Sequence, residues 1–407
     1  MQSSTEKDLH TPDEVRTRPP ARRRRAVALL VFVVAAAVVI VSAGVAATAG
    51  HNPEHPVYLP ASPWLDSWAR WDAGWYVGIA EHGYSYEPGR PSGVAFFPLY
   101  PLALRLARNL GANPFYAGIA LTFVAGAASV SLFHRWCAGR IGADRADIAS
   151  IALAFYPFSF FLVGAVYADG LFLALTLGAF VLLEHDRPWA AGLLALLAGA
   201  TRPVGPAIVA GLFLRQLERR GVVRGAATEG RGNSLNLRAL RPGDAGLLLA
   251  PLGFVAYLAY LWERFGDPLA FAATQSAPGW DQGAGPATWF KLSFFKALAA
   301  IPPVHPGQAR IVIHAVLAVG ALVLVPRVFR RLGWGYGGYA LAVLALPAIA
   351  SKDFTGMGRY ILAAFPCFAV LPDLLEGRPR LAMALLGLST MLLVTFTALF
   401  AQGWYLS

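Results

Sequence analysis

Residues 26–50 read AVALLVFVVAAAVVIVSAGVAATAG, an apolar run without a charged side chain that directly follows the four arginines Arg22–Arg25. A secretory signal peptide has the same order of charge and hydrophobicity, but its apolar core spans only about 7–15 residues. The run is longer and matches a transmembrane helix, which needs about 20 residues. We therefore predict a retained first transmembrane helix, with residues 1–25 as a basic cytoplasmic tail and the next segment outside the cytoplasm.

The composition of the whole chain extends this prediction. Of its 407 residues, 57% are hydrophobic and only 14% are charged, whereas a soluble domain usually carries about 25% charged residues. The deficit of charge excludes a soluble enzyme, a disordered scaffold and a coiled coil, and leaves an all-α polytopic membrane protein. The net charge of +11 is spread over short loops between apolar runs. That distribution is typical of membrane topology, so we expect contact with the lipid bilayer and no nucleic-acid partner.

Ten further apolar runs follow the first and predict about 11 transmembrane helices in a single domain over residues 26–407. They cover residues 114–133, 148–165, 169–183, 189–200, 204–214, 245–262, 311–325, 335–350, 360–371 and 381–402. Residues 51–112 form a long first extracytoplasmic loop. The runs 189–200 and 204–214 are short enough to form one kinked helix instead of two.

The distribution of Lys and Arg decides between these two layouts. With two separate helices, the segments predicted to lie inside hold 23 of the 34 Lys and Arg residues. These segments are 1–25, 134–147, 184–188, 215–244, 326–334 and 372–380. A single kinked helix would place the seven arginines of 215–244 outside, which the positive-inside rule opposes. We therefore predict a helical hairpin with Thr201-Arg202-Pro203 at its outer tip.

In this layout the polar clusters of the chain all fall on the outer face. They are Trp71-Asp72, Tyr167–Asp169, Arg202, Phe265–Pro268 and Lys352–Tyr360. An outer face that carries all the polar clusters and an inner face made of simple arginine-rich connecting loops indicate an enzyme that works outside the cytoplasm. The alternative class, a transporter of lipids or lipid-linked sugars, more often has midplane polar groups and internal repeats, and the sequence shows no internal repeat.

Residues 64–84 are the densest of these polar and aromatic segments. Trp68, Trp71 and Trp75 recur at helical spacing and predict one aromatic stripe, with Asp72 at its rim. Partial desolvation there would raise the pKa of Asp72 and make it a better proton acceptor. The alternative is an interfacial aromatic belt in which Asp72 caps the helix or pairs with Arg70.

Residues 96–101 read FFPLYP and lead into an amphipathic stretch, for which we predict a helix on the outer surface. We expect Arg105 and Arg108 of this helix to reach lipid phosphates. Further along, the Gly- and Pro-rich residues 277–306 include Trp280 and Trp289. We interpret them as an ordinary interfacial loop, with a flexible cover on the acceptor side as the alternative.

Together these segments resemble the PIG-V mannosyltransferase family. The first block comprises Arg70–Ala73, Tyr76, Ile79–Tyr84 and Phe96–Pro101, and the later matches are Thr201–Gly205, Phe265–Phe271, Gly358–Tyr360 and Phe365-Pro366. The resemblance thus runs from about residue 64 to residue 366. The sequence departs from the pattern at Val166–Asp169, where we expect Tyr-Ser/Thr-Glu. The shorter acid puts the role of Asp169 in question.

The resemblance implies a multi-pass cell-membrane glycosyltransferase with a GT-C-like bundle and an active site on the extracytoplasmic side. It implies that mannose passes from polyprenyl phosphomannose to a glycan or glycolipid acceptor in a single inverting displacement, with Asp72 as general base. A transporter, or the same enzyme class with another polyprenyl-linked sugar, is the alternative. The 30 Arg against 4 Lys are typical of a GC-rich bacterial genome. Cys137 and Cys367 lie far apart, and we expect no disulfide.

Candidate substrate-binding residues follow from the same resemblance and from the outer-face charges. Arg202, Lys352 and Arg359 are candidates for the leaving phosphate, although each cation has the alternative of simply snorkelling to the interface. Asp169 and Tyr360 are candidates for sugar hydroxyls, or for packing and helix capping. The first block adds Arg70, Trp71, Tyr76, His82 and Tyr84. Glu81 and His82 lack a second histidine at ligand spacing, so we expect no metal and no cofactor.

Overall fold

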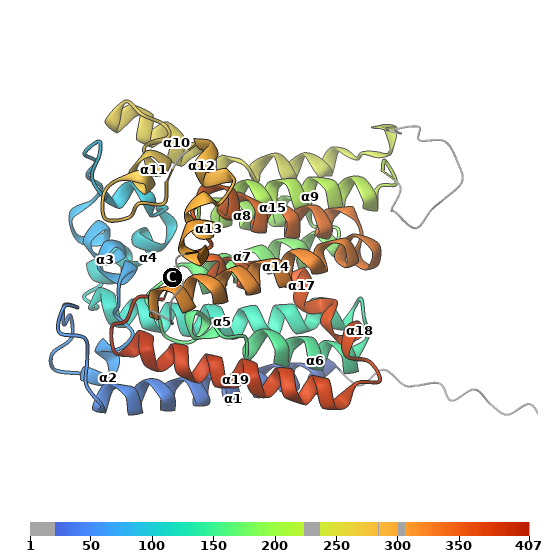
Figure 1. Ribbon diagram of the computed structural model, residues 1–407. Coiled ribbons are helices and arrows are strands. Elements are labelled where there is room, and N and C mark those ends of the chain that lie inside the picture. Colours follow the sequence, from blue (N-terminus) through green and yellow to red (C-terminus); the bar gives the residue numbers. More distant parts are fainter. Residues whose placement is uncertain (1–20, 224–236, 284, 300–305, 407) are drawn as a thin grey trace, which may run out of the picture.

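The computed structural model describes residues 21–223, 237–283, 285–299 and 306–406 of the chain (Figure 1). Every regular element in these ranges is an α-helix or a 3-10 helix (η). Most of the predicted cytoplasmic tail, residues 1–20, lies outside the described residues. The long helices run roughly side by side, and the short helices α2, α3, α4 and α11 gather at one end of the bundle.

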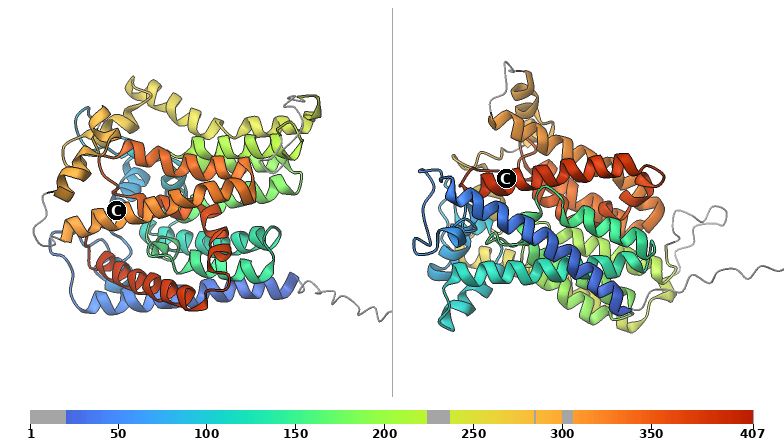
Figure 2. Two further views of the ribbon diagram at one scale, coloured as in Figure 1. Left: turned by 45° about the vertical axis from the view of Figure 1, so that its right-hand side comes forward. Right: turned by 90° about the horizontal axis from the view of Figure 1, so that it is seen from below.

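Five helical segments of the described chain are long and apolar enough to cross a membrane. They are α1 (Ala21–Thr48), α5 (Pro114–Ala138), α14 (Pro306–Leu332), α19 (Pro379–Ala401) and the segment Pro242–Phe265, which joins η4 (Pro242–Leu249) to α10 (Leu252–Phe265). In Figure 2, α1 and α19 lie along the same side of the bundle, where they pack together. An all-α polytopic membrane protein is thereby confirmed, and the number of eleven spans stays a prediction.

Shorter helices pack against these spans and against one another. They are α6 (Ala143–Ala154), α7 (Asp169–Glu184), α8 (Pro188–Gly199), α9 (Gly205–Arg219) and α15 (Trp334–Ala350). The predicted single run over 148–165 is wrong, because α6 ends at Ala154 and only the short η2 (Ser159–Leu162) follows. Pro157 explains the break, since a proline disfavours helical geometry in the residue before it.

The predicted run over 360–371 is also broken. Its residues belong to α16 (Met357–Ala363), α17 (Phe365–Ala369) and α18 (Leu371–Leu375), and the axis bends by 68° between α16 and the segment that follows. Pro366 and Pro372 stand in the first turns of α17 and α18, where proline is tolerated. If the bent pair counts as one span, the described chain holds up to six.

The hairpin predicted for residues 189–214 is confirmed. Arg220 follows the end of α9, and its guanidinium lies 2.9 Å from the carboxylate of Asp186, which precedes α8. The end of α9 has therefore returned to the start of α8, so the two helices are antiparallel. Residues 201–204 form the turn between them, as the distribution of arginines predicts.

Each end of the bundle carries its own set of ion pairs. At one end, Glu184 binds Arg140 and Arg215, and Asp373 binds Arg145 and Arg331. Both carboxylates and all four arginines belong to segments predicted to lie inside, so the fold gathers those segments together. The charged residues of the candidate site lie at the other end, near α3.

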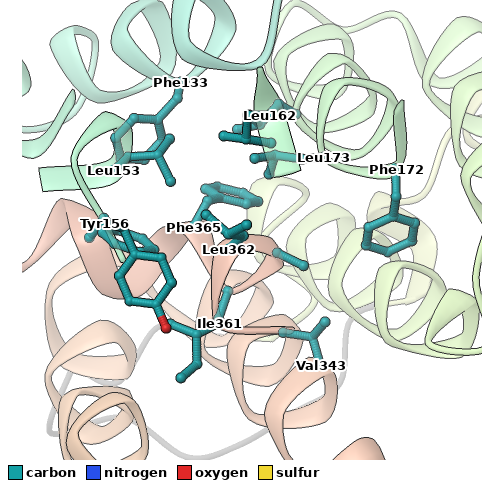
Figure 3. Close-up of a cluster of buried hydrophobic side chains, with 14 of the residues drawn as sticks. Phe133, Leu153, Tyr156, Leu162, Phe172, Leu173, Val343, Ile361, Leu362 and Phe365 are labelled. Atoms are coloured by element: carbon teal, nitrogen blue, oxygen red, sulfur yellow. The ribbon is translucent and has the colours of Figure 1, made fainter. Parts of the chain in front are cut away.

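The hydrophobic core lies where α5, α7, α15 and α17 meet (Figure 3). Phe365 is fully buried there, with its ring centroid 4.9 Å from that of Trp136 and 5.4 Å from that of Tyr339. Gly126 of α5 permits close packing, because a Cβ at that position would overlap the carbonyl oxygen of Leu162 in η2. The core thus fixes both η2 and the bent segment that carries Arg359.

Residues 51–112, predicted to be the first extracytoplasmic loop, fold into α2 (Pro63–Asp66), α3 (Asp72–His82), η1 (Gly93–Ala95) and α4 (Leu99–Asn109). The single aromatic stripe is wrong, because the chain leaves α2 and turns at Trp71, whose φ is 50°, before α3 begins. Trp68 is consequently buried in the core, whereas Trp75 is exposed on α3.

The amphipathic helix after the FFPLYP segment is confirmed as α4. Tyr100 and Leu104 are buried, while Leu102 and Leu106 are exposed on another face. Nε of Arg105 donates to the carbonyl oxygen of Ala80, 2.9 Å away, near the end of α3, and its contact with lipid phosphates stays a prediction. Arg108 is exposed.

Candidate active site

Four charged side chains from distant parts of the chain meet at the α3 end of the bundle. Arg359 of α16 lies between two carboxylates, with Nη1 2.8 Å from Oδ2 of Asp72 and Nη2 3.2 Å from Oδ2 of Asp169. Arg202, in the turn between α8 and α9, donates to the other oxygen of Asp169. We call these four residues the charge cluster. Two carboxylates balance two guanidinium groups, so its net charge is zero.

Both carboxylates of the charge cluster stand at the first residue of a helix. Asp72 begins α3 and Asp169 begins α7. A negative charge at this position interacts favourably with the helix dipole and with the unpaired backbone N–H groups of the first turn. The left-handed turn at Trp71 therefore has a chemical consequence, because it places Asp72 at a helix start rather than inside one continuous helix.

The residues before Asp169 are held by specific contacts. The backbone N–H of Val166 donates to the carbonyl oxygen of Trp68 at 3.2 Å, and the hydroxyl of Thr122 donates to that of Ala165 at 2.8 Å. Gly164 packs against the ring of Trp68, where any Cβ would collide with the indole. These contacts join the segment between α2 and α3 to the start of α7 and so set the relative positions of Asp72 and Asp169.

Aromatic rings hold both guanidinium groups. The guanidinium carbon of Arg202 lies 4.5 Å from the ring centroid of Tyr360, and that of Arg359 lies 4.6 Å from the ring of Tyr167 and 5.1 Å from that of Phe161. Each such contact contributes about 0.5–2 kcal/mol. The rings restrict the orientation of the arginines without using their N–H donors, which stay available for anionic groups.

Exposure differs sharply within the charge cluster. The side chains of Asp169 and Arg202 are 2% and 5% exposed, that of Arg359 is 11% exposed and that of Asp72 is 22% exposed. Asp72 is therefore the member that a second reactant reaches most easily. Burial raises the pKa of Asp72 above its usual value, and the neighbouring charge of Arg359 acts in the opposite direction.

One donor of the charge cluster has no partner. Nε of Arg359 is buried and forms no hydrogen bond within the described part of the chain. A buried donor without a partner is uncommon in folded proteins. An acceptor oxygen from a bound molecule would satisfy it.

The structure brings some predicted site residues to the cluster. Asp72, Asp169, Arg202, Arg359 and Tyr360 meet as described above. Tyr76 is buried one turn after Asp72, with its ring centroid 6.3 Å from that of Tyr167.

Other predicted site residues have different surroundings. Arg70 is buried and pairs with Asp66 at 2.6 Å, so its expected pairing with Asp72 is wrong. Tyr84 donates its hydroxyl to the carbonyl oxygen of Phe96, 2.7 Å away. His82 is exposed at the end of α3, and Lys352 forms no ion pair with any residue that the structure describes. Trp71 packs its ring against His55 and Tyr405.

Sequence reasoning did not include Tyr167 and Phe161 in the candidate site. The hydroxyl of Tyr167 also accepts a hydrogen bond from the backbone N–H of Asp72, 3.1 Å away. A signal for Tyr167 existed, because it stands two residues before Asp169 in a polar cluster already singled out. Phe161 carries no such signal, since its contact with Arg359 depends on the break between α6 and α7.

Comparisons with known proteins point to one family. The sequence profile of the mannosyltransferase (PIG-V) family matches residues 24–270, a range that includes Asp72, Asp169 and Arg202. GPI alpha-1,6-mannosyltransferase 2 of Rattus norvegicus is 34% identical over 168 residues, which cover 39% of this chain and 33% of that protein. Its counterpart in Homo sapiens is 33% identical over 152 residues, covering 35% of this chain and 30% of that protein.

The chain thus matches about a third of the length of these curated relatives. Among solved structures, ArnT from Cupriavidus metallidurans bound to undecaprenyl phosphate is similar with a TM-score of 0.45 and 14% sequence identity. That match covers 85% of this chain and 60% of the other.

Proposed function

Since this chain belongs to the PIG-V mannosyltransferase family, we propose that it is a multi-pass membrane enzyme that transfers mannose from polyprenyl phosphomannose to a glycan or glycolipid acceptor. Residues 26–407 form one GT-C-like catalytic domain in this proposal, with residues 51–112 as its first extracytoplasmic loop. The observation that carries the proposal is the charge cluster, in which the guanidinium group of Arg359 lies between the partly exposed carboxylate of Asp72 and the buried carboxylate of Asp169.

Asp72 acts as the general base. Its carboxylate accepts the proton of the acceptor hydroxyl while that oxygen attacks the anomeric carbon of the donor. The bond between the anomeric carbon and the phosphate oxygen breaks in the same displacement, and its electron pair leaves with polyprenyl phosphate. A single displacement of this kind inverts the anomeric centre. The raised pKa of Asp72 supports this role, because it makes the carboxylate a stronger base.

Arg202 and Arg359 bind the phosphate of the donor. Guanidinium groups suit this task because they offer several N–H donors in a plane. The phosphate gains a second negative charge as the bond to the sugar breaks, so buried cations stabilise the transition state more than the bound donor. Asp169 is a positioning residue in this account, because it contacts both arginines.

Donor binding changes the charge balance around Asp72. The charge cluster is neutral without substrate, and the donor phosphate adds a negative charge that competes with Asp72 for Arg359. When Arg359 shifts toward the phosphate, Asp72 loses the cation that stabilises its ionised form. The carboxylate therefore becomes a stronger base once the donor has bound.

The proposed orientation places the N-terminus in the cytoplasm and the charge cluster on the extracytoplasmic side of the cell membrane. The arginine-rich ion pairs at the opposite end of the bundle support this orientation through the positive-inside rule. The donor headgroup and the charge cluster would then lie at the same leaflet.

Membranes from cells that express the wild type or Asp72→Asn test the proposal. They receive labelled polyprenyl phosphomannose or a polyprenyl phosphopentose, and label is followed into lipid and polymer fractions at matched expression. We expect the wild type to transfer mannose and Asp72→Asn to lose activity by roughly 100-fold or more. Absence of transfer by both proteins from an intact mannose donor would refute the proposal. If only the pentose were transferred, the enzyme class would stand and the donor sugar would be a pentose.

A further inference from the structure

We propose that Trp75 and Trp280 form an aromatic platform that stacks against a sugar ring of the acceptor, beside Asp72. The inference rests on the proposed function and adds to it the place where the acceptor binds. It concerns residues outside the charge cluster, on α3 and on the loop of residues 277–283. We call these two tryptophans the platform.

The platform lies one helical turn from the proposed base. Trp75 follows Asp72 by three residues in α3, and side chains three apart are neighbours on a helix surface. Its ring centroid lies 5.5 Å from that of Trp280, with an angle of 73° between the two planes. Phe96 stacks behind Trp75 at 5.9 Å and 18°, and meets the edge of Trp280 at 6.0 Å. Two indoles at a steep angle, backed by one ring, make a corner next to Asp72.

Exposure distinguishes Trp75 from the other large apolar side chains of α3. Trp75 is 36% exposed, whereas Tyr76, Val77 and Ile79 are buried. Trp280 is half-buried. A large aromatic face that is exposed yet held by two other rings is suited to binding, because little side-chain entropy remains to be lost.

A hexopyranose ring matches such a corner. One face of a pyranose carries several C–H groups and is apolar, so it packs against an indole, while the hydroxyl groups at its rim stay free for hydrogen bonds. With that face on Trp75, a rim hydroxyl points along α3 toward Asp72. The platform therefore orients the acceptor for the proton transfer that Asp72 performs.

Two backbone hydrogen bonds hold the loop that carries Trp280. The backbone N–H of Gln282 donates to the carbonyl oxygen of Gln275 at 2.9 Å, and the backbone N–H of Lys352 donates to that of Gln282 at 2.6 Å. Lys352 begins the segment that leads to Arg359. Because Trp280 also contacts Trp75 of α3, the loop connects α3 with the segment that leads to Arg359, as an acceptor subsite next to a phosphate site requires.

Substitution of the two tryptophans tests the platform in the full-length protein in lipid nanodiscs. The variants are Trp75→Ala, Trp75→Phe and Trp280→Ala, and the matched control is Trp262→Ala, because Trp262 is 67% exposed near the end of α10. Initial rates are measured against the fraction that takes up label and against the donor. Saturation-transfer NMR with methyl α-mannoside reports sugar binding without catalysis.

We expect the acceptor KM to rise about tenfold in Trp75→Ala and Trp280→Ala, less in Trp75→Phe, and not at all in Trp262→Ala, with the donor KM unchanged. Saturation transfer should be lost in both alanine variants and kept in Asp72→Asn. An unchanged acceptor KM, an equal rise in donor KM, or no sugar signal with the wild type would overturn the platform. Sugar binding without transfer by the wild type would refute the catalytic proposal instead.

Discussion

Asp72 shares Arg359 with Asp169, and this sharing determines how strongly the Asp72 carboxylate holds its proton. Burial raises the pKa of Asp72, and the charge of Arg359 lowers it. Only the ionised carboxylate accepts a proton, so base activity is present above the pKa of Asp72 and is lost as the pH falls through it. Removing the positive charge at position 359 takes away the lowering contribution and raises that pKa.

The pH profile of transfer therefore depends on residue 359. We expect the acidic limb of kcat in Arg359→Gln to lie at higher pH than in the wild type, and that in Arg359→Lys to stay close to the wild type. Rates of each variant are normalised to its own maximum, because Arg359 also binds the donor in our proposal. An acidic limb at the same pH in all three proteins would show that the charge at position 359 does not influence the pKa of the base.

Most of the charge cluster is predictable at the level of single residues. Asp72, Asp169, Arg202 and Arg359 stand out because charged residues are rare next to apolar runs. Which cation pairs with which carboxylate is not predictable, since Asp72 and Arg359 are 287 residues apart and meet only in the fold. The pairing of Arg70 with Asp66 was available from their separation of four residues.

At the scale of elements, contacts between helix backbones determine where the segments that carry the charge cluster lie. Gly126 of α5 lies against the carbonyl group of Leu162, the residue after Phe161, whose ring contacts Arg359. A side chain at position 126 would push η2 away from α5. The breaks after α6 and within 357–375 coincide with Pro157 and Pro366, so a proline inside each apolar run is the sequence signal for the break.

Gly126→Ala should consequently destabilise the protein by about 1–3 kcal/mol, the usual range for overpacking. The matched control is Gly387→Ala in α19, where a new Cβ meets nothing within 4 Å. Alanine there should leave stability unchanged or raise it by up to about 1 kcal/mol. Thermal unfolding of both variants in nanodiscs, followed by tryptophan fluorescence, measures the difference. Equal unfolding midpoints of the two variants would show that α5 and η2 can accommodate an extra Cβ at position 126 without loss of stability.

At the scale of the whole molecule, the fold separates two kinds of charge. At the end near α18, arginines of different connecting segments form ion pairs with Asp373, and the end near α3 carries the charge cluster (Figure 1). Hydropathy and charge bias predicted this division because both depend on composition along the chain. They could not define the spans, since α8 and α15 are apolar but shorter than a full crossing.

Cysteine labelling of intact cells tests the proposed orientation. Glu81→Cys places a thiol at the exposed end of α3, and Glu376→Cys places one at the opposite end, where Glu376 is 66% exposed. The native Cys137 and Cys367 are buried and should give little background. We expect a membrane-impermeant maleimide to label Glu81→Cys in intact cells and Glu376→Cys only after permeabilisation. The reverse pattern would place the charge cluster in the cytoplasm.

The central claim, that Asp72 is the base of a mannosyl transfer at the charge cluster, is tested most directly by single-turnover kinetics. Purified wild type and Asp72→Asn are mixed with saturating donor and acceptor in nanodiscs, and donor binding is measured on the same samples. We predict a rate constant lower by about 100-fold or more in Asp72→Asn, with donor affinity kept or increased because Arg359 is released. A rate within a few-fold of the wild type at full donor occupancy would contradict the claim.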